Sequence, residues 1–259
     1  MFSSRSHLMG RARFITVLAK EFSATFRLVP LILGGMITPL FIYFIFGQAI
    51  GANQVSAGGI PLQQYMVPGT LLFQLVYSTF YQASYSTFFS SNITQTMDEL
   101  LTSPLSSTDI LLGRIANSTV ISVLVAIPLM AILAAASGIK PHLGWMALAL
   151  LALTLVAVVS SLLGTLLGLI VDNEFSLINF ANVIVIPLIF ISDTFVQISA
   201  YHPGVQVLLY LSPVKLGNDV VRQALLKHEL TLIAAVILLL HVAVWWVIVH
   251  RVFEVKSRS

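Results

Sequence analysis

Five long stretches of this chain contain no Lys, Arg, Asp or Glu, and they constrain its fold more than any other feature. They cover residues 28–97, 115–139, 141–171, 175–192 and 230–250. An α-helix needs about 20 predominantly apolar residues to cross the hydrocarbon core of a bilayer. Each stretch reaches or nearly reaches that length, and only 9% of the chain is charged, against about 25% in soluble domains. The chain is therefore predicted to be an integral membrane protein.

The first of these stretches must contain a turn. At about 1.5 Å per residue, residues 28–97 would form a helix roughly 105 Å long, whereas the hydrocarbon core is about 30 Å thick. A glycine-rich polar segment at 47–64 marks the turn, because glycine and polar residues favour loops. The pattern predicts an all-α membrane fold with six transmembrane helices, at residues 28–46, 65–90, 115–137, 145–171, 176–192 and 230–249.

Residues 193–213 do not fit a further spanning helix. His202-Pro203-Gly204 and Ser212-Pro213 interrupt them and leave only a short apolar run at 205–211. Irregular backbone is tolerated at membrane depth only where protein or water satisfies its polar groups. We therefore predict a re-entrant or interfacial hairpin between the fifth and sixth helices, followed by an amphipathic segment at 215–229.

Lys and Arg are distributed unevenly between the two sides of this topology. With the N-terminus inside, nine of the 13 lie on the inner side and four on the outer, so the positive-inside rule predicts cytoplasmic termini. Residues 1–27 mix cations with apolar residues at helical spacing, which favours an interfacial amphipathic helix over a cleaved secretory signal. This helix either only anchors the chain or transmits movement to the first span. We interpret the chain as one membrane domain, with a six-span bundle at 28–249 and a cytoplasmic tail at 250–259.

The longest predicted cytoplasmic connection, residues 92–109, carries a helix-start signal. Thr96 with Glu99 three residues later matches a capping box, and Pro104 ends this short helix about two turns further on. Such a helix between two spans either packs on its own bundle or serves as a docking site for another subunit.

Several motifs, in this order, resemble the permease subunits of type-2 ABC exporters, a family that includes polysaccharide, glycolipid, nodulation-factor and drug exporters. The run DELLTSPLS at 98–106 resembles the family's EEL-hydrophobic-x-x-P segment. QYMVPG at 64–69 resembles the opening of the second span, and LSPV at 211–214 followed by DVVR at 219–222 resembles the region before the sixth. Ser212 stands where the family often has Asn. The resemblance covers nearly the whole chain.

This resemblance implies a coupling helix that inserts into a groove of a separate ABC ATPase subunit. The implied coupling residues are Met97, Asp98, Glu99, Leu100, Leu101, Ser103 and Pro104. It also implies a homodimer in a bacterial inner membrane, with ATP and Mg²⁺ on the partner and no cofactor on this chain. The residues themselves agree that the chain is not an enzyme, because it contains no G-x-x-x-x-G-K-[ST] phosphate-binding loop.

Polar side chains within two predicted spans are candidates for lining a transport path. Aromatic rings can stack on the apolar faces of sugars, or they can pack between helices with their hydroxyls bonded to neighbours. Asparagines in a span likewise either form interhelical hydrogen bonds or line a path. The candidates are Gln74, Tyr77, Tyr81 and Tyr85 in the second span and Asn179 and Asn182 in the fifth.

Two residue pairs have a predicted structural or gating role. Asp193 and Arg222, at the non-cytoplasmic end, either pair and form an exit gate or face lipid headgroups as separate charges. Gly164 and Gly168 form a G-x-x-x-G motif, which favours close helix packing within or between subunits. No metal site is predicted. The lack of cysteine excludes Cys-ligated zinc, and a haem would lack a second histidine ligand because only His241 lies deep in a span.

The sequence is interpreted as the membrane-spanning permease subunit of an ATP-driven ABC exporter. Two copies would form the path for an amphipathic, glycan-like, lipid-like or drug-like substrate. The alternative is an ATP-independent secondary transporter or channel, which spans without ionisable residues disfavour. A membrane enzyme is disfavoured by the lack of paired carboxylates, a metal cluster or an activated nucleophile. A nucleic acid partner is not expected, since a net charge of +3 needs none in a membrane protein.

Overall fold

The computed structural model describes residues 34–51, 54–55, 59–93, 106–140, 142–194 and 201–256. The predicted interfacial helix at 1–27 and the predicted coupling segment at 97–104 lie outside these residues. Within them every named element is a helix, and one isolated bridge joins Val55 to Pro61. The described part of the chain is therefore all-α, as predicted.

The helical segments follow one another along the chain, and short π-helical segments extend several of them. In order they are α3 (Ile37–Ile42), η1 (Tyr43–Ile50), α4 (Leu62–Phe88), η2 (Phe89–Ile93), α6 (Ser107–Ser137), α7 (Leu143–Ile170), α8 (Glu174–Ile189), η3 (Phe190–Thr194), α9 (Pro203–Tyr210), α10 (Pro213–Arg222), η5 (Gln223–Lys227) and α11 (Leu232–Lys256).

Helix boundaries differ from the prediction where local capping decides them. The first helical region continues through η1 to Ile50, past the predicted end at residue 46. α6 begins at Ser107 rather than at 115, because Ser106 forms a capping box. The backbone N–H of Asp109 donates to Ser106 Oγ at 3.1 Å, and the N–H of Ser106 donates to Asp109 Oδ2 at 3.2 Å. The same helix ends at Gly138, whose φ of 72° is the left-handed conformation that glycine favours.

Three of the described helices are long and apolar enough to cross a membrane, namely α6, α7 and α11. α4 is also long, with 27 residues, but Gln, Ser, Thr and Tyr side chains lower its hydropathy. α8 and the stretch 37–50 are shorter apolar helices. α11 is the most exposed of the long helices, with only 17% of its most apolar window buried. Apolar surface of this kind is suited to lipid.

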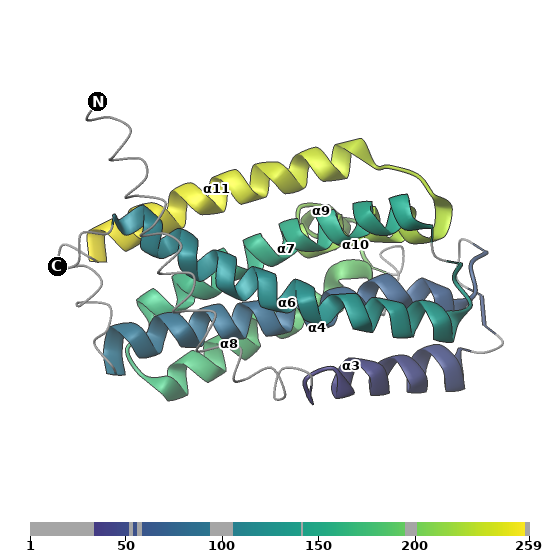
Figure 1. Ribbon diagram of the computed structural model, residues 1–259, viewed down its shortest axis with the longest axis horizontal. Coiled ribbons are helices and arrows are strands. Elements are labelled where there is room, and N and C mark those ends of the chain that lie inside the picture. The colour runs from purple at the N-terminus through teal and green to yellow at the C-terminus, as the bar shows by residue number, and fades with distance from the viewer. Residues whose placement is uncertain are drawn as a thin grey trace, which may run out of the picture.

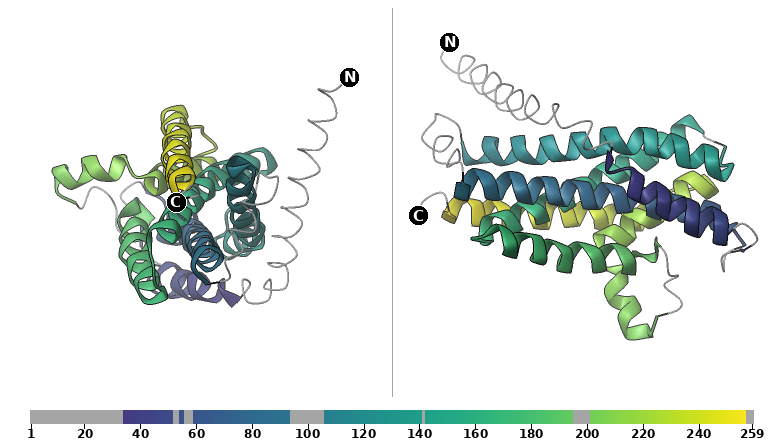
Figure 2. Two further views of the ribbon diagram at one scale, coloured as in Figure 1. Left: turned by 90° about the vertical axis from the view of Figure 1, so that its left-hand side faces the viewer. Right: turned by 90° about the horizontal axis from the view of Figure 1, so that it is seen from below.

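α4 and α7 form the centre of a bundle whose long helices run along one axis (Figure 1). α4 packs against α6, α7, α8, α10 and η1, and α7 packs in turn against α11. Figure 2 shows these neighbours arranged around the two central helices, with α9 projecting sideways from the bundle. The polar helix α4 therefore lies inside, where several of its Thr, Ser and Gln side chains are buried among other helices. Its fully buried Leu71, Leu72 and Leu75 belong to the hydrophobic core.

The contact between α4 and α7 is close because two glycines lie in it. A Cβ atom built on Gly164 would lie 2.3 Å from the carbonyl oxygen of Phe80, and one on Gly168 would lie 2.4 Å from that of Ser84. Only residues without a side chain fit at these distances. The predicted close packing at the G-x-x-x-G motif is thus confirmed, between helices of one chain.

The bundle has two distinct ends. At one end Asn92 bonds the carbonyl oxygen of Val171, and Lys256 bonds that of Leu169. At the other end Gln64 bonds the carbonyl oxygen of Ser137 at 3.3 Å. The described helix ends that flank residues 94–105 and the end of α11 therefore lie together, as the predicted topology requires of segments on one side of a membrane.

Candidate functional site

The predicted tyrosine stripe of α4 is part of a longer aromatic ladder. Phe73, Tyr77, Tyr81, Tyr85 and Phe89 follow one another with ring centroids 4.4–6.3 Å apart. Three of these four neighbouring pairs are stacked, with interplanar angles of 5°, 26° and 20°. The ring faces are therefore covered by one another, and edges and hydroxyls remain for outside contacts. These contacts show that the rings pack on their neighbours along α4, and the role of the ladder as a path lining stays a prediction.

The other predicted lining residues differ in their contacts and in their exposure. Tyr81 donates a hydrogen bond of 2.6 Å to Asn182 Oδ1, which joins α4 to α8. Asn179 is exposed and bonds the carbonyl oxygen of Phe175 on its own helix at 2.8 Å. Tyr77 is 41% exposed, whereas Gln74 is only 3% exposed. Gln74 thus lies in the packed core of this chain, whereas Tyr77 lies on the exposed side of the aromatic ladder.

The second candidate region begins where α8 and η3 end. Ser192 and Asp193 leave the helical conformation there, and Asp193 adopts a φ of 63°. Asp and Asn enter this left-handed region more readily than most residues, because a short polar side chain can bond locally. The turn places the Asp193 carboxylate in the protein interior, where the residue is 6% exposed.

The structure brings Asp193 and Arg222 together in a buried ion pair. Arg222 Nη1 lies 2.6 Å from Asp193 Oδ2, and its Nη2 donates to the Asp193 carbonyl oxygen at 2.6 Å. Tyr65 of α4 donates its hydroxyl to Asp193 Oδ1 at 2.9 Å, and the centroid of its ring lies 3.8 Å from Arg222 Cζ. Asn218, fully buried, donates to the same carbonyl oxygen at 3.1 Å. Pairing, the first of the two alternatives for this pair, is the observed one.

A second ion pair adjoins the first on α10. Lys215 Nζ lies 2.5 Å from both carboxylate oxygens of Asp219 and 3.9 Å from Asp193 Oδ2. Burial raises the pKa of the Asp219 carboxyl, and the ammonium of Lys215 opposes that rise. The two carboxylates and two cations balance, so the cluster carries no net charge. We call these four residues, with Tyr65 and Asn218, the charge network.

The charge network lies well inside the bundle, away from its nearer end. α10 packs on α7 where Gly217 meets Val156, and η5 ends where the His228 ring meets Trp145. At about 1.5 Å per residue, these two positions on α7 lie roughly 16 Å apart. Arg222 and Asp193 lie between the two levels, beside helices apolar enough to span a membrane. Ionisable groups buried beside such helices are costly unless they are paired.

Several of these residues could not be named from the sequence. Lys215 and Asp219 stand four positions apart, a spacing that signals an ion pair on a helix, but the prediction placed them only on an amphipathic segment. Tyr65 lies within the QYMVPG motif and Asn218 directly before DVVR, and neither carried a further signal. The predicted coupling residues at 97–104 lie outside the described part of the chain. Their role, and that of Asp193 and Arg222 as a gate, stay predictions.

Comparison with known proteins agrees with this architecture. Residues 12–226 match the model of the ABC-2 type transporter membrane family. The chain is 26% identical over 200 residues to the inner membrane transport permease YadH of Escherichia coli K12, with 77% of each chain covered. A protein of the same name from Shigella flexneri matches equally well. The chain is therefore a membrane protein that belongs to the ABC-2 type transporter family of permease subunits.

Proposed function

We propose that this chain is the membrane-spanning subunit of an ATP-driven exporter. In this proposal it forms one six-span domain in a bacterial inner membrane, with both termini in the cytoplasm and a re-entrant segment after the fifth span. Two copies enclose the path of an amphipathic glycan-like, lipid-like or drug-like substrate. A separate ABC ATPase subunit binds ATP and Mg²⁺ and carries out the hydrolysis.

The charge network is the observation that carries this proposal. Asp193, Lys215 and Arg222 lie buried beside spanning helices, with Asp219 half-buried next to them, and breaking a buried ion pair costs about 3–5 kcal/mol. A passive membrane anchor has no need for this arrangement. The network joins α4 through Tyr65, the α8 end through Asp193 and α10 through Arg222, so it holds together three elements that must separate or slide if an exit opens between them.

The network also contains groups that can bond in a second arrangement. Among the described residues, Arg222 Nε and Asn218 Oδ1 are buried and have no hydrogen-bond partner. A fully satisfied buried network rigidifies a protein, and this network leaves these two groups without a partner. We infer that the Asp193–Arg222 pair closes the non-cytoplasmic exit and that its rupture accompanies opening. In this proposal residues 97–104 transmit the movement of the ATPase to the membrane bundle, and the predicted interfacial helix at 1–27 takes part in this transmission.

The open face of α4 and α8 lines the path in this proposal. Tyr77, Tyr81 and Tyr85 present hydroxyls and ring edges there, beside Asn179 and Asn182. Hydroxyls and amides bind polar groups, while ring edges contact apolar ones. This combination suits a substrate with both characters, which is why an amphipathic molecule is proposed.

Purification of the tagged full chain from its native membranes tests this proposal. We expect a nucleotide-binding subunit to co-purify, with ATPase activity that liposome reconstitution couples to transport. A matched preparation carrying Glu99→Arg should retain the permease but lose the ATPase or the coupling. Recovery of the chain alone, with transport that continues without ATP, would overturn the proposal.

An ATP-independent secondary transporter is the second candidate, and one observation favours it. Asp193 and Asp219 are carboxylates at depth, and proton-coupled carriers use such groups. The same liposomes separate the two candidates. Transport driven by a pH gradient in the absence of ATP would favour the secondary transporter, whereas dependence on ATP favours the exporter.

A further inference from the structure

Two histidines from distant parts of the chain meet at the end of the bundle that lies nearer the charge network. His142 precedes α7 as its N-cap residue, and His228 follows η5 in the left-handed conformation, with φ 56°. Their ring centroids lie 5.8 Å apart, with an interplanar angle of 51°. His142 and His228 are both exposed, and their places next to two helical segments bring their rings to the same end of the bundle.

We propose that His142 and His228 form a binding site for a divalent transition-metal ion of the Zn²⁺, Cu²⁺ or Ni²⁺ class. Imidazole nitrogen is a preferred ligand of these ions. With metal–nitrogen bonds of about 2.0–2.1 Å, two coordinated rings have centroids about 5.2 Å apart at a tetrahedral angle and about 6.4 Å apart in a line. The observed 5.8 Å lies between these limits.

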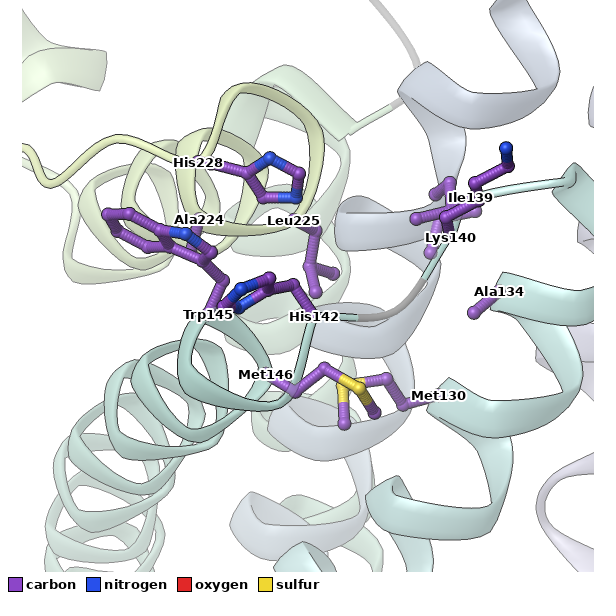
Figure 3. A pocket seen from close by; sticks show the side chains of 11 residues that line it. Met130, Ala134, Ile139, Lys140, His142, Trp145, Met146, Ala224, Leu225 and His228 are labelled. Carbon is purple, nitrogen blue, oxygen red and sulfur yellow. The ribbon is translucent and has the colours of Figure 1, made fainter.

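The surroundings leave the ring edges available. Trp145 stacks on His228 at 6.0 Å with an interplanar angle of 27°, which covers a ring face. Metal ions bind in the plane of imidazole, at a nitrogen on the ring edge, so this stacking orients the ligand without blocking it. Figure 3 shows Trp145, His142 and His228 grouped together, with Lys140 pointing away from both rings. The Lys140 ammonium is thereby kept away from the bound ion.

Water completes the coordination in this proposal. Among the described residues, no third His, Cys, Asp or Glu joins the two histidines. The two rings line a cavity of about 10 Å³, and a cavity of roughly that size holds one water molecule. A site with two protein ligands and open positions binds its metal more weakly than a closed structural site.

A bound ion would cross-link the start of α7 to the end of η5. α7 carries Val156, and η5 continues α10, whose Gly217 meets Val156 and which ends at Arg222. If α10 slides on α7 when the exit opens, the ion holds the exit closed. This consequence rests on the proposed function, whereas metal binding itself does not.

Calorimetric titration of the detergent-purified full chain with Zn²⁺ tests the site directly. The purification tag must contain no histidine. The variants are His142→Ala and His228→Ala, and His202→Ala is the matched control because His202 is also exposed. Even the loss of an outer-shell partner weakens a metal site by about tenfold or more, so we expect at least that loss in each of the two variants and none in the control. Mg²⁺ should not bind at this site.

The outcomes are separable from those of the transport experiments. The proposal is wrong if either His142→Ala or His228→Ala binds Zn²⁺ as tightly as the parent chain, or if His202→Ala loses as much. Circular dichroism of each variant confirms that it is folded. A positive titration with no effect of Zn²⁺ on transport would keep the site and reject the clamp.

Discussion

The contact between α4 and α7 allows a stability prediction with a defined magnitude. Replacing Gly164 with Ala places a methyl group 2.3 Å from the Phe80 carbonyl oxygen and 3.2 Å from the Ala83 Cβ. An ordinary carbon–oxygen contact is about 3.3 Å. The obstacle is helix backbone, which no side-chain rotation relieves. The two central helices must therefore move apart by about 1 Å.

Overpacking of this kind typically costs about 1–3 kcal/mol. Alanine is favoured over glycine in a helix by about 1 kcal/mol, and that gain offsets part of the cost. We therefore expect Gly164→Ala to lower the free energy of unfolding by up to about 2 kcal/mol. Gly168→Ala, whose Cβ would lie 2.4 Å from the Ser84 carbonyl oxygen, should have a similar effect. The double variant should lose less than the sum, because the first methyl has already separated the helices.

Unfolding in mixed micelles, followed by circular dichroism as the fraction of denaturing detergent rises, measures these changes. Gly144→Ala is the matched control on the same helix, since its Cβ would lie 3.7 Å from the nearest atom, His142 Nδ1, in ordinary contact. We expect this control to be neutral or slightly stabilised. If Gly164→Ala is as stable as Gly144→Ala, or if the two alanine effects at 164 and 168 add fully, the close-contact reasoning is refuted.

Three further predictions concern the network, the ladder and the coupling segment. Asp193→Asn keeps a residue that tolerates the left-handed turn but leaves Arg222 without its carboxylate, so unfolding should become easier by about 3–5 kcal/mol; adding Arg222→Gln should restore part of this loss, and an unchanged stability of the single variant would contradict a buried pair. Tyr81→Phe removes the hydrogen bond to Asn182 and should lower the unfolding free energy by about 0.5–1.5 kcal/mol; no change in the same assay would show that the bond contributes little. Glu99→Arg should reduce ATP-driven transport in liposomes, and normal transport would exclude a coupling role for that residue.

Much of the secondary structure was predictable because it depends on short-range properties. The charge-free stretches and the breaks between them placed α7 within two residues of its observed ends. The G-x-x-x-G motif indicated close packing because only small residues at that spacing let two helix backbones approach. The predicted helix boundaries were wrong where a capping residue sets the helix end, as at Ser106. A cap depends on local hydrogen bonds, and hydropathy does not report them.

The candidate site was less predictable, because it is assembled from distant parts of the chain. Asp193 and Arg222 stood out as charges near predicted span ends, yet the sequence left open whether they pair or face lipid. Tyr65 is 128 positions from Asp193, and nothing in its own neighbourhood signals that contact. The stacking of the α4 aromatics was not predictable either. A four-residue spacing places the side chains on one side of the helix, but it does not show whether the rings contact one another.

The sequence by itself determined that the chain is a helical membrane protein and which segments form its long helices. These properties follow from hydropathy, charge placement and helix-breaking residues, each of which acts within a few turns. Only the tertiary structure decided that the polar helix α4 lies at the centre, that Gly164 meets the backbone at Phe80, and that Asp193 turns inward to meet Arg222. The physical reason is that burial and ion pairing depend on which surfaces face each other, and that is set by the packing of all the helices together.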